Sequence, residues 1–179
     1  MSDLKLAAEA IREADAILIT AGAGMGVDSG LPDFRGDNGF WKAYPPYQKL
    51  KVGFSAMADP TWFRSDPKFA WGFYGHRRNL YRKTVPHGGY AILRKWATQR
   101  SDNYFVFTSN VDNAFKKAGF ADDKIVECHG AIEWNQCTCG VGITAAGDEE
   151  VVIDMETMRA TDNVPTCPGC GKGTRPNIM

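Results

Sequence analysis

The sequence has no excess of charge of one sign, no long apolar run and no internal repeat. Lysine and arginine total 21, as do aspartate and glutamate, so the formal net charge is zero. A balanced charge gives no support for a nucleic-acid-binding or anionic-membrane-binding surface. No apolar run approaches the roughly 18 residues that span a bilayer, and the first residues lack a signal-peptide profile. We therefore expect no nucleic-acid partner, no membrane partner and a cytoplasmic location.

The composition is that of a globular chain with room for a core. A length of 179 residues fits one domain, or one domain with a small insert. A hydrophobic fraction of 44% is enough for a packed interior. Five cysteines in an intracellular chain favour metal ligation or free thiols over disulfides.

The apolar pattern predicts short buried strands separated by helices, which favours a parallel α/β sheet. Residues 37–70 are rich in proline, glycine and aromatic residues, and we expect packed short helices and loops there because aromatic side chains favour burial. The helix expected near residues 87–99 should turn Tyr90, Leu93 and Trp96 inward. The predicted helices cover 2–14, 67–83, 87–99 and 114–118, and the predicted strands cover 16–20, 104–108 and 124–127.

A glycine-rich stretch, GAGMGVDSGLPDFRG at residues 22–36, follows the first predicted strand. Glycines there let the backbone approach a ligand, and backbone N–H groups in such a turn can receive a diphosphate. Arg35 adds a cation suited to phosphate, and Phe34 offers a ring for a flat group. The spacing departs from the G-x-G-x-x-G fingerprint, and Lys42 stands where an acidic residue is expected. An ordinary loop is the alternative.

Polar side chains follow the other two strands. Asn110 and Asp112 come after the second strand, where an amide and a carboxylate can hold a carboxamide or a ribose. A polar turn that caps the next helix is the alternative. His129 ends the third strand and suits a general base, although a lone histidine is also common in a purely structural role. We expect all three strand ends to open onto one crevice.

Two cysteine pairs suggest a metal site. Cys137 and Cys139 form a C-x-C pair, and Cys167 and Cys170 form a C-P-G-C knuckle. Four thiolates predict a closed tetrahedral zinc site without a catalytic role, whose binding free energy, on the order of 10 kcal/mol, helps fold the surrounding segment. Four free thiols are the alternative. Cys128 is left over and is expected to pack.

Tyr74 and Arg77 lie three residues apart on the helix expected at 67–83, so they share a face. A phenol and a guanidinium together suit a carboxylate. A solvated arginine beside a core tyrosine is the alternative interpretation.

The motifs, in this order, resemble the sirtuin family of NAD-dependent protein deacylases. The family pattern is a GAG turn leading to PDFR, a Thr-Gln-Asn-Ile-Asp stretch, a His-Gly and a zinc module, and the resemblance runs from about residue 16 to the end. Two departures stand out. Ser109 replaces the glutamine that helps position the nicotinamide ribose, and Gly26 stands where a serine is common.

The resemblance implies a protein lysine deacylase, a transferase that moves the acyl group to ADP-ribose and releases nicotinamide. It implies NAD and Zn²⁺ as cofactors and an acyl-lysine protein or peptide as substrate. His129 would act as base on a ribose hydroxyl, Asn110 would organise the ribose and water, and Asp112 would hold the nicotinamide carboxamide. The implied NAD-binding residues are Gly22, Ala23, Gly24, Asp33, Phe34, Arg35, Ser109, Asn110, Val111 and Asp112. Tyr74 and Arg77 match a Tyr-x-x-Arg pair that binds acidic acyl groups in members that prefer succinyl- or malonyl-lysine.

The resemblance also implies a domain plan. Residues 1–130 would form a Rossmann-like NAD-binding domain with a helical insert at about 37–85, and residues 131–175 would form the zinc module. Residues 176–179 would begin the return to a second half of the dinucleotide fold. We expect no further strand after the last cysteine, so the Rossmann sheet would be partial and would need a partner or a further segment to complete it.

Two other functions share these features. An NAD glycohydrolase or ADP-ribosyl transferase would use the same pocket without an acylated peptide. A non-catalytic zinc-binding interaction module would keep the metal and bind no NAD.

Overall fold

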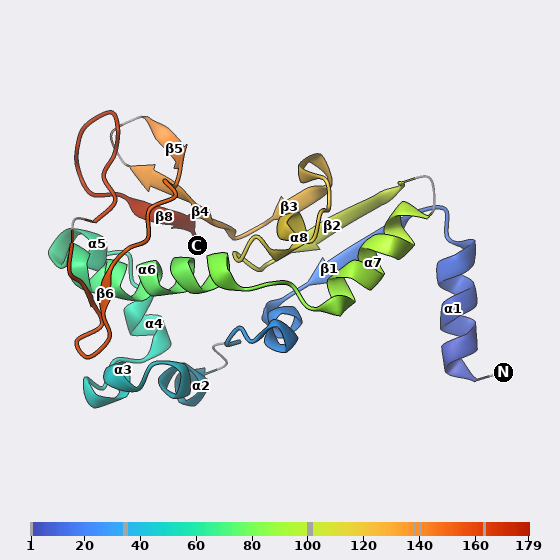
Figure 1. Ribbon diagram of the computed structural model, residues 1–179, viewed down its shortest axis with the longest axis horizontal. Coiled ribbons are helices and arrows are strands. Elements are labelled where there is room, and N and C mark those ends of the chain that lie inside the picture. Colours follow the sequence, from blue (N-terminus) through green and yellow to red (C-terminus); the bar gives the residue numbers. More distant parts are fainter. Residues whose placement is uncertain (1, 34–35, 100–101, 138, 140, 163) are drawn as a thin grey trace.

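The computed structural model describes residues 2–33, 36–99, 102–137, 139, 141–162 and 164–179. Figure 1 shows an elongated chain in which a parallel sheet with its helices occupies one end and a group of antiparallel strands the other. A long helix and the strand that leaves the parallel sheet connect the two ends. Within the described part of the chain, no helix is both long enough and apolar enough to cross a bilayer.

The parallel sheet contains the three predicted strands. These are β1 (Ile17–Ala21), β2 (Tyr104–Thr108) and β3 (Ile125–Glu127), in the order β1-β2-β3. Ile19 pairs with Val106, which pairs in turn with Ile125. Because both pairings are parallel, the carboxyl ends of the strands meet at one edge.

One face of the parallel sheet is covered by a hydrophobic core. Helices α7 (Gly88–Thr98) and α8 (Ala114–Lys117) contribute to it. The buried side chains of this core are Ile19, Tyr90, Ala97, Tyr104, Val106, Ala114, Phe115 and Phe120. The expected inward position of Trp96 is wrong: its side chain is 40% exposed, and the next residue, Ala97, is buried instead.

The opposite face of the sheet is open among the described residues. Leu18 is 66% exposed, Phe105 39% and Phe107 46%. The prediction that residues 104–108 form a buried strand therefore holds for one face only. β2 alternates buried and exposed side chains, because only one of its faces is covered.

Helix α1 (Asp3–Glu13) forms where it was predicted but stands apart at one end of the chain (Figure 1). None of its residues is buried. Ser2 occupies the N-cap position with extended backbone and makes no side-chain cap hydrogen bond. The helix therefore rests on sequence propensity and its own hydrogen bonds more than on packing.

The aromatic segment packs, as its composition predicts. It forms the short helices α2 (Gly36–Ala43), α3 (Pro45–Lys49), α4 (Phe54–Met57) and α5 (Trp62–Ser65). The Phe40 ring stacks on Tyr47 at a centroid distance of 5.4 Å and meets Phe73 edge-on at 5.6 Å. These contacts make the largest core of the chain.

Helix α6 (Pro67–Lys83) joins the two ends of the molecule and matches its predicted bounds. Asp66 caps it by accepting a hydrogen bond from the backbone N–H of Phe69. A hairpin of β6 (Ile153–Asp154) and β7 (Arg159–Ala160) packs on its backbone. A Cβ atom at Gly72 would lie 1.9 Å from the carbonyl oxygen of Met158, so only glycine fits there.

The second sheet is antiparallel. Its strands β4 (Gly130–Cys137), β5 (Gly142–Ala145) and β8 (Arg175–Ile178) lie in the order β5-β4-β8. The expectation that no strand follows the last cysteine is wrong. β8 is only four residues long and contains Pro176, so it carries no clear strand signal, and its pairing is supplied by the longer β4.

Candidate functional site

The three strand ends open onto one pocket. The 3-10 helix η1 (Ala23–Ser29) begins just after β1, Ser109 follows β2 directly, and His129 lies just after β3. The pocket has a volume of about 300 Å³. Its described lining from these strand ends is Ala23, Gly26, Ser109, Asn110, Val111, Asp112 and His129. The structure thus brings together the three motifs that the sequence predicts to converge.

The glycine-rich turn is fastened to the second strand end. Gly22 has extended backbone, and its carbonyl oxygen accepts a hydrogen bond from Asn110 Nδ2 at 3.0 Å. Gly22 and Gly24 are not among the described residues that line the pocket, whereas Ala23 and Asp33 are. Phe34 and Arg35, predicted to bind the cofactor, lie outside the described residues.

The loop after β2 holds its polar groups firmly. Asn110 is 8% exposed, and its backbone N–H donates to Thr108 Oγ1 at 3.0 Å. Asp112 Oδ1 accepts a hydrogen bond from the backbone N–H of Ala114, the first residue of α8, at 3.0 Å. Asp112 therefore supports the helix start, as the capping alternative predicts, and also lines the pocket, whereas its contact with a ligand stays a prediction. Burial raises the pKa of Asp112 above its ordinary value, and the Ala114 N–H partly offsets this.

Gly26 and Ser109 are the two departures from the sirtuin pattern, and both line the pocket. A Cβ atom at Gly26 would lie 3.2 Å from Leu31 Cδ1 and 3.6 Å from Asp112 Oδ2. A serine at this position would therefore press on Leu31 and bring its side chain close to the Asp112 carboxylate. The small residues leave room at this end of the pocket.

His129 lies where β3 passes into β4. Its carbonyl oxygen accepts a hydrogen bond from the backbone N–H of Met179, which brings the end of β8 against the pocket. His129 is one of the residues that line the pocket. Cys128, which precedes it, is half-buried and is not among the described lining residues.

Helix α6 supplies the other wall. Tyr74 and Arg77 are 6% and 7% exposed, and both line the pocket. The alternative of a solvated arginine is therefore wrong. Arg77 donates from Nε and Nη2 to the hydroxyl of Tyr81, at 3.1 and 2.8 Å.

Tyr81 is a lining residue that the sequence analysis missed. It lies four residues after Arg77, which places the two side chains on one face of α6. The Arg77 guanidinium donates a hydrogen bond to the Tyr81 hydroxyl, and its Cζ atom lies 5.4 Å from the centroid of the Tyr81 ring. The i, i+4 spacing of a long cation and a phenol was the signal that could have identified it.

The four predicted metal ligands form one cluster. All four Sγ atoms lie within 4.8 Å of one another, with Cys139 and Cys167 at 3.4 Å and Cys137 and Cys170 at 3.6 Å. The backbone N–H of Val141 and the neighbouring thiols lower the pKa of Cys139, whereas hydrogen bonds to the other thiols raise the pKa of Cys137, so the four sulfur atoms interact closely. The donor set and its spacing fit a tetrahedral zinc ion held by thiolates alone.

A comparison with protein-family models decides the family. The Sir2 family model matches residues 22–179. This chain belongs to the Sir2 family. The match covers the glycine-rich turn, the loop after β2, His129 and the cysteine cluster.

Two relatives that resemble this chain are named as NAD-dependent protein deacylases. The chain is 30% identical over 179 residues to NAD-dependent protein deacylase 1 of Caldanaerobacter subterraneus subsp. tengcongensis, which covers 99% of this chain and 65% of that protein. It is 32% identical over 177 residues to the NAD-dependent protein deacylase of Thermococcus kodakarensis, covering 97% and 62%. A Sir2 homologue solved in complex with NAD aligns with a TM-score of 0.71 at 25% identity, over 100% of this chain and 62% of that one. The chain thus spans less than two thirds of the length of these proteins.

Proposed function

We propose that this Sir2-family chain carries out NAD-dependent removal of acyl groups from lysine side chains. One observation carries the proposal: the glycine-rich turn, the Asn110–Asp112 loop, His129 and the Tyr74–Arg77 face of α6 all line a single pocket. The deacylase names of its relatives support the same reaction.

The pocket suits the nicotinamide-ribose end of NAD. It combines a buried amide, a carboxylate and an imidazole with the small residues Ala23 and Gly26, which leave room for a flat ring. NAD, when bound, supplies an electrophilic ribose carbon on loss of nicotinamide, to which the acyl oxygen adds. The rest of the chemistry falls to side chains of this chain.

Each polar residue has a distinct role. Asp112, whose carboxylate is already oriented by the Ala114 N–H, accepts hydrogen bonds from the nicotinamide carboxamide. Asn110 is held by Gly22 and orients the ribose and a water molecule. His129 takes a proton from a ribose hydroxyl and so acts as the general base.

We also propose that the acyl group this chain prefers is acidic. Arg77 brings a guanidinium into the pocket within 5.9 Å of the Tyr74 ring centroid, and both side chains are buried. A buried cation strengthens the binding of a carboxylate because little water competes for it. Succinyl- and malonyl-lysine carry such a carboxylate, whereas acetyl-lysine does not.

Zinc would hold the antiparallel region together. The ion would bind Cys137 and Cys139 at the end of β4 and Cys167 and Cys170 before β8. Four protein thiolates leave no open coordination position, so its role is structural.

We infer that a partner or a further polypeptide segment covers the open face of the parallel sheet. Leu18, Phe105 and Phe107 expose apolar surface on that face, and parallel sheets are normally covered on both sides. Such a cover would complete the dinucleotide fold beside β1 to β3.

The test is nicotinamide release from NAD, measured with no peptide and with acetyl-, malonyl- and succinyl-lysine peptides. We expect release that depends on an acylated peptide and is fastest with the acidic acyl groups. Release without any peptide would instead indicate an NAD glycohydrolase. No NAD binding and no release, with zinc retained, would indicate a non-catalytic zinc-binding module.

A further inference from the structure

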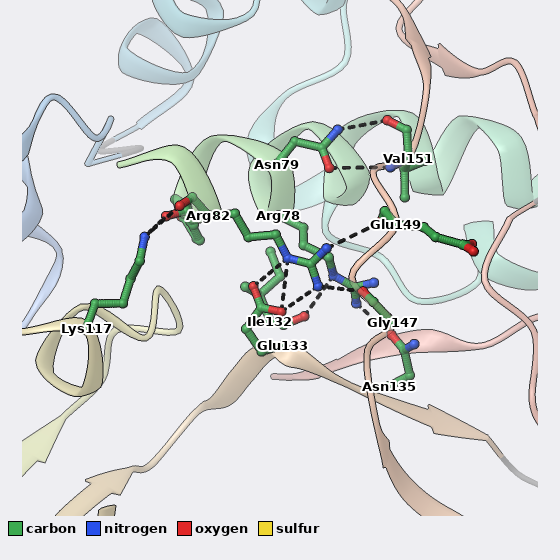
Figure 2. Close-up of polar contacts among 11 residues, drawn as sticks. Arg78, Asn79, Arg82, Lys117, Ile132, Glu133, Asn135, Gly147, Glu149 and Val151 are labelled. Carbon is green, nitrogen blue, oxygen red and sulfur yellow. Dashed lines mark hydrogen bonds and ion pairs between the residues drawn. The ribbon is translucent and has the colours of Figure 1, made fainter. Parts of the chain in front are cut away.

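The last turn of α6 is held by a lysine from another helix. The final carbonyl groups of an α-helix have no partner within the helix. Here Lys117 Nζ, at the end of α8, donates to the carbonyl oxygens of Tyr81 at 2.7 Å, Arg82 at 2.8 Å and Thr84 at 2.7 Å. An ammonium group has three donors, and each of these three contacts uses one. Figure 2 shows Lys117 reaching the end of α6 from the neighbouring segment.

The same turn is also held by the antiparallel region. Arg82 Nη2 donates to Glu133 Oε2 at 2.6 Å and to the carbonyl oxygen of Gly147 at 2.8 Å, and Nε contacts both Glu133 oxygens. Arg82 Nη1 reaches the carbonyl oxygen of Glu149 at 3.3 Å. In Figure 2 these contacts converge on one guanidinium between β4 and the loop that follows β5.

The chain segment that carries Lys117 is part of the pocket. Asp112 lines the pocket and starts α8 through its bond to Ala114, and Lys117 ends the same four-residue helix. Lys117 therefore links the carbonyl end of α6 directly to the loop proposed to bind nicotinamide.

The turn of α6 that Lys117 holds carries Tyr81, which contacts the arginine proposed to bind the acyl group. Tyr81 is 6% exposed, lines the pocket, and receives both hydrogen bonds from Arg77 through its hydroxyl. The backbone of Tyr81 is bonded to Lys117, and its side chain is bonded to Arg77. A shift of this last turn must therefore move the guanidinium relative to Asp112.

We propose that Lys117 is a positioning residue for acyl recognition. It fixes the last turn of α6 against α8, and through Tyr81 it sets the place of the Arg77 guanidinium in the pocket. This inference rests on the proposed function and adds to it the residue that maintains the preference for acidic acyl groups.

The chain offers a matched control. Lys116 precedes Lys117 on α8 and forms an ion pair with Glu127 at 3.4 Å. Lys116→Met removes the same charge from the same helix while leaving the contacts to α6 in place. Lys117→Met removes the three donors, and Lys117→Arg keeps donors at that position.

The experiment measures kcat and KM for succinyl-lysine and acetyl-lysine peptides with saturating NAD, in the wild type and the three variants. In Lys117→Met we expect the ratio of kcat/KM for succinyl over acetyl to fall about tenfold, mainly through a higher KM, because a misplaced contact group costs one to two orders of magnitude. Lys117→Arg should recover most of the ratio, and Lys116→Met should keep it. Hydrogen exchange at the backbone of residues 80–84 should quicken in Lys117→Met alone.

The other outcomes are also decisive. An equal loss for both peptides in Lys117→Met, or the same loss of the ratio in Lys116→Met, overturns the positioning role while leaving the deacylase function intact. If the wild type turns over only the acetyl peptide, the proposed preference for acidic acyl groups is wrong, and the positioning role of Lys117 is overturned with it. A wild type that releases no nicotinamide with either peptide contradicts the proposed function itself.

Discussion

The two ends of the molecule differ in how completely their elements are covered. The parallel sheet packs helices on one face and leaves Leu18, Phe105 and Phe107 exposed on the other. Around α6, by contrast, an aromatic cluster and the β6–β7 hairpin bury the helix so closely that Gly72 touches backbone. Yet the thinly covered end supplies His129, Asn110 and Asp112. We interpret the α6 end as the framework, and the sheet edge as the region that carries the groups we propose to react.

Loss of the metal site should give the largest loss of stability, because the proposed zinc ion links the end of β4 to the segment before β8. In the double variant Cys139→Ser with Cys167→Ser, we expect residues 131–175 to lose their fold, since structural zinc contributes on the order of 10 kcal/mol in small domains. Metal content measured by mass spectrometry and circular dichroism will check this. The matched control is Cys128→Ser, which should keep one zinc per chain. A double variant with native spectra and native thermal stability would contradict the framework role.

The close contact between Gly72 of α6 and the β6–β7 hairpin allows a second test of how tightly this end of the molecule is packed. Gly72→Ala places a Cβ 1.9 Å from the Met158 carbonyl oxygen, so the hairpin must move, at a cost of about 3 kcal/mol or more in unfolding free energy. This outweighs the gain of about 1 kcal/mol that alanine normally brings to a helix.

The control for that substitution is Gly88→Ala in α7, where a Cβ would meet nothing within 4 Å. It should leave stability unchanged or raise it by about 0.5 kcal/mol. Urea unfolding of both variants will compare them. Equal stabilities would mean that the hairpin does not rest on the backbone of α6.

The two faces of β2 should respond differently to substitution. Val106 is fully buried, so Val106→Ala should lower the unfolding free energy by about 2 kcal/mol. Phe107 points to the open face, so Phe107→Ser should change it by no more than about 0.5 kcal/mol and should reduce self-association. Light scattering and urea unfolding measure both. A large loss of stability in Phe107→Ser would show that this face is already covered within the chain.

The smallest predicted effect concerns pH. Burial raises the pKa of Asp112 above its ordinary value of 3.8, so the folded state disfavours the carboxylate. The resulting loss of stability begins as pH rises past 3.8 and is complete above the folded-state pKa. Asp112→Asn removes that loss and keeps an oxygen for the Ala114 N–H.

The Asp112→Asn variant should therefore unfold at a higher temperature than the wild type at pH 7, and the difference should shrink as pH falls toward 3.8. It should also bind nicotinamide more weakly. A constant difference in melting temperature across this pH range would mean that the carboxylate carries no burial penalty.

Local patterns predicted much of the fold. The α6 helix, the three parallel strands and the packed aromatic segment follow from proline caps, apolar runs and ring content, which act over a few residues. Membership of the Sir2 family, expected from the motifs, is confirmed by the family comparison. The clustering of the four cysteines also follows from their paired spacing.

The features that the sequence could not supply are set by distant contacts. β8 exists because β4 pairs with it, and the exposure of Phe105 and Phe107 depends on what covers the sheet. Tyr81 joins the pocket only because α6 lies across the sheet edge. The proposed domain bounds and the catalytic and binding roles of individual residues remain predictions.

The most direct test of the central claim is peptide-dependent nicotinamide release by His129→Ala, compared with Cys128→Ala as the neighbouring control. The account predicts that His129→Ala loses about two to four orders of magnitude in turnover while it keeps its zinc and its circular dichroism spectrum, because only the proposed base is removed. Cys128→Ala should retain near-native turnover. Undiminished release by His129→Ala would contradict the claim that the three strand ends form one catalytic pocket.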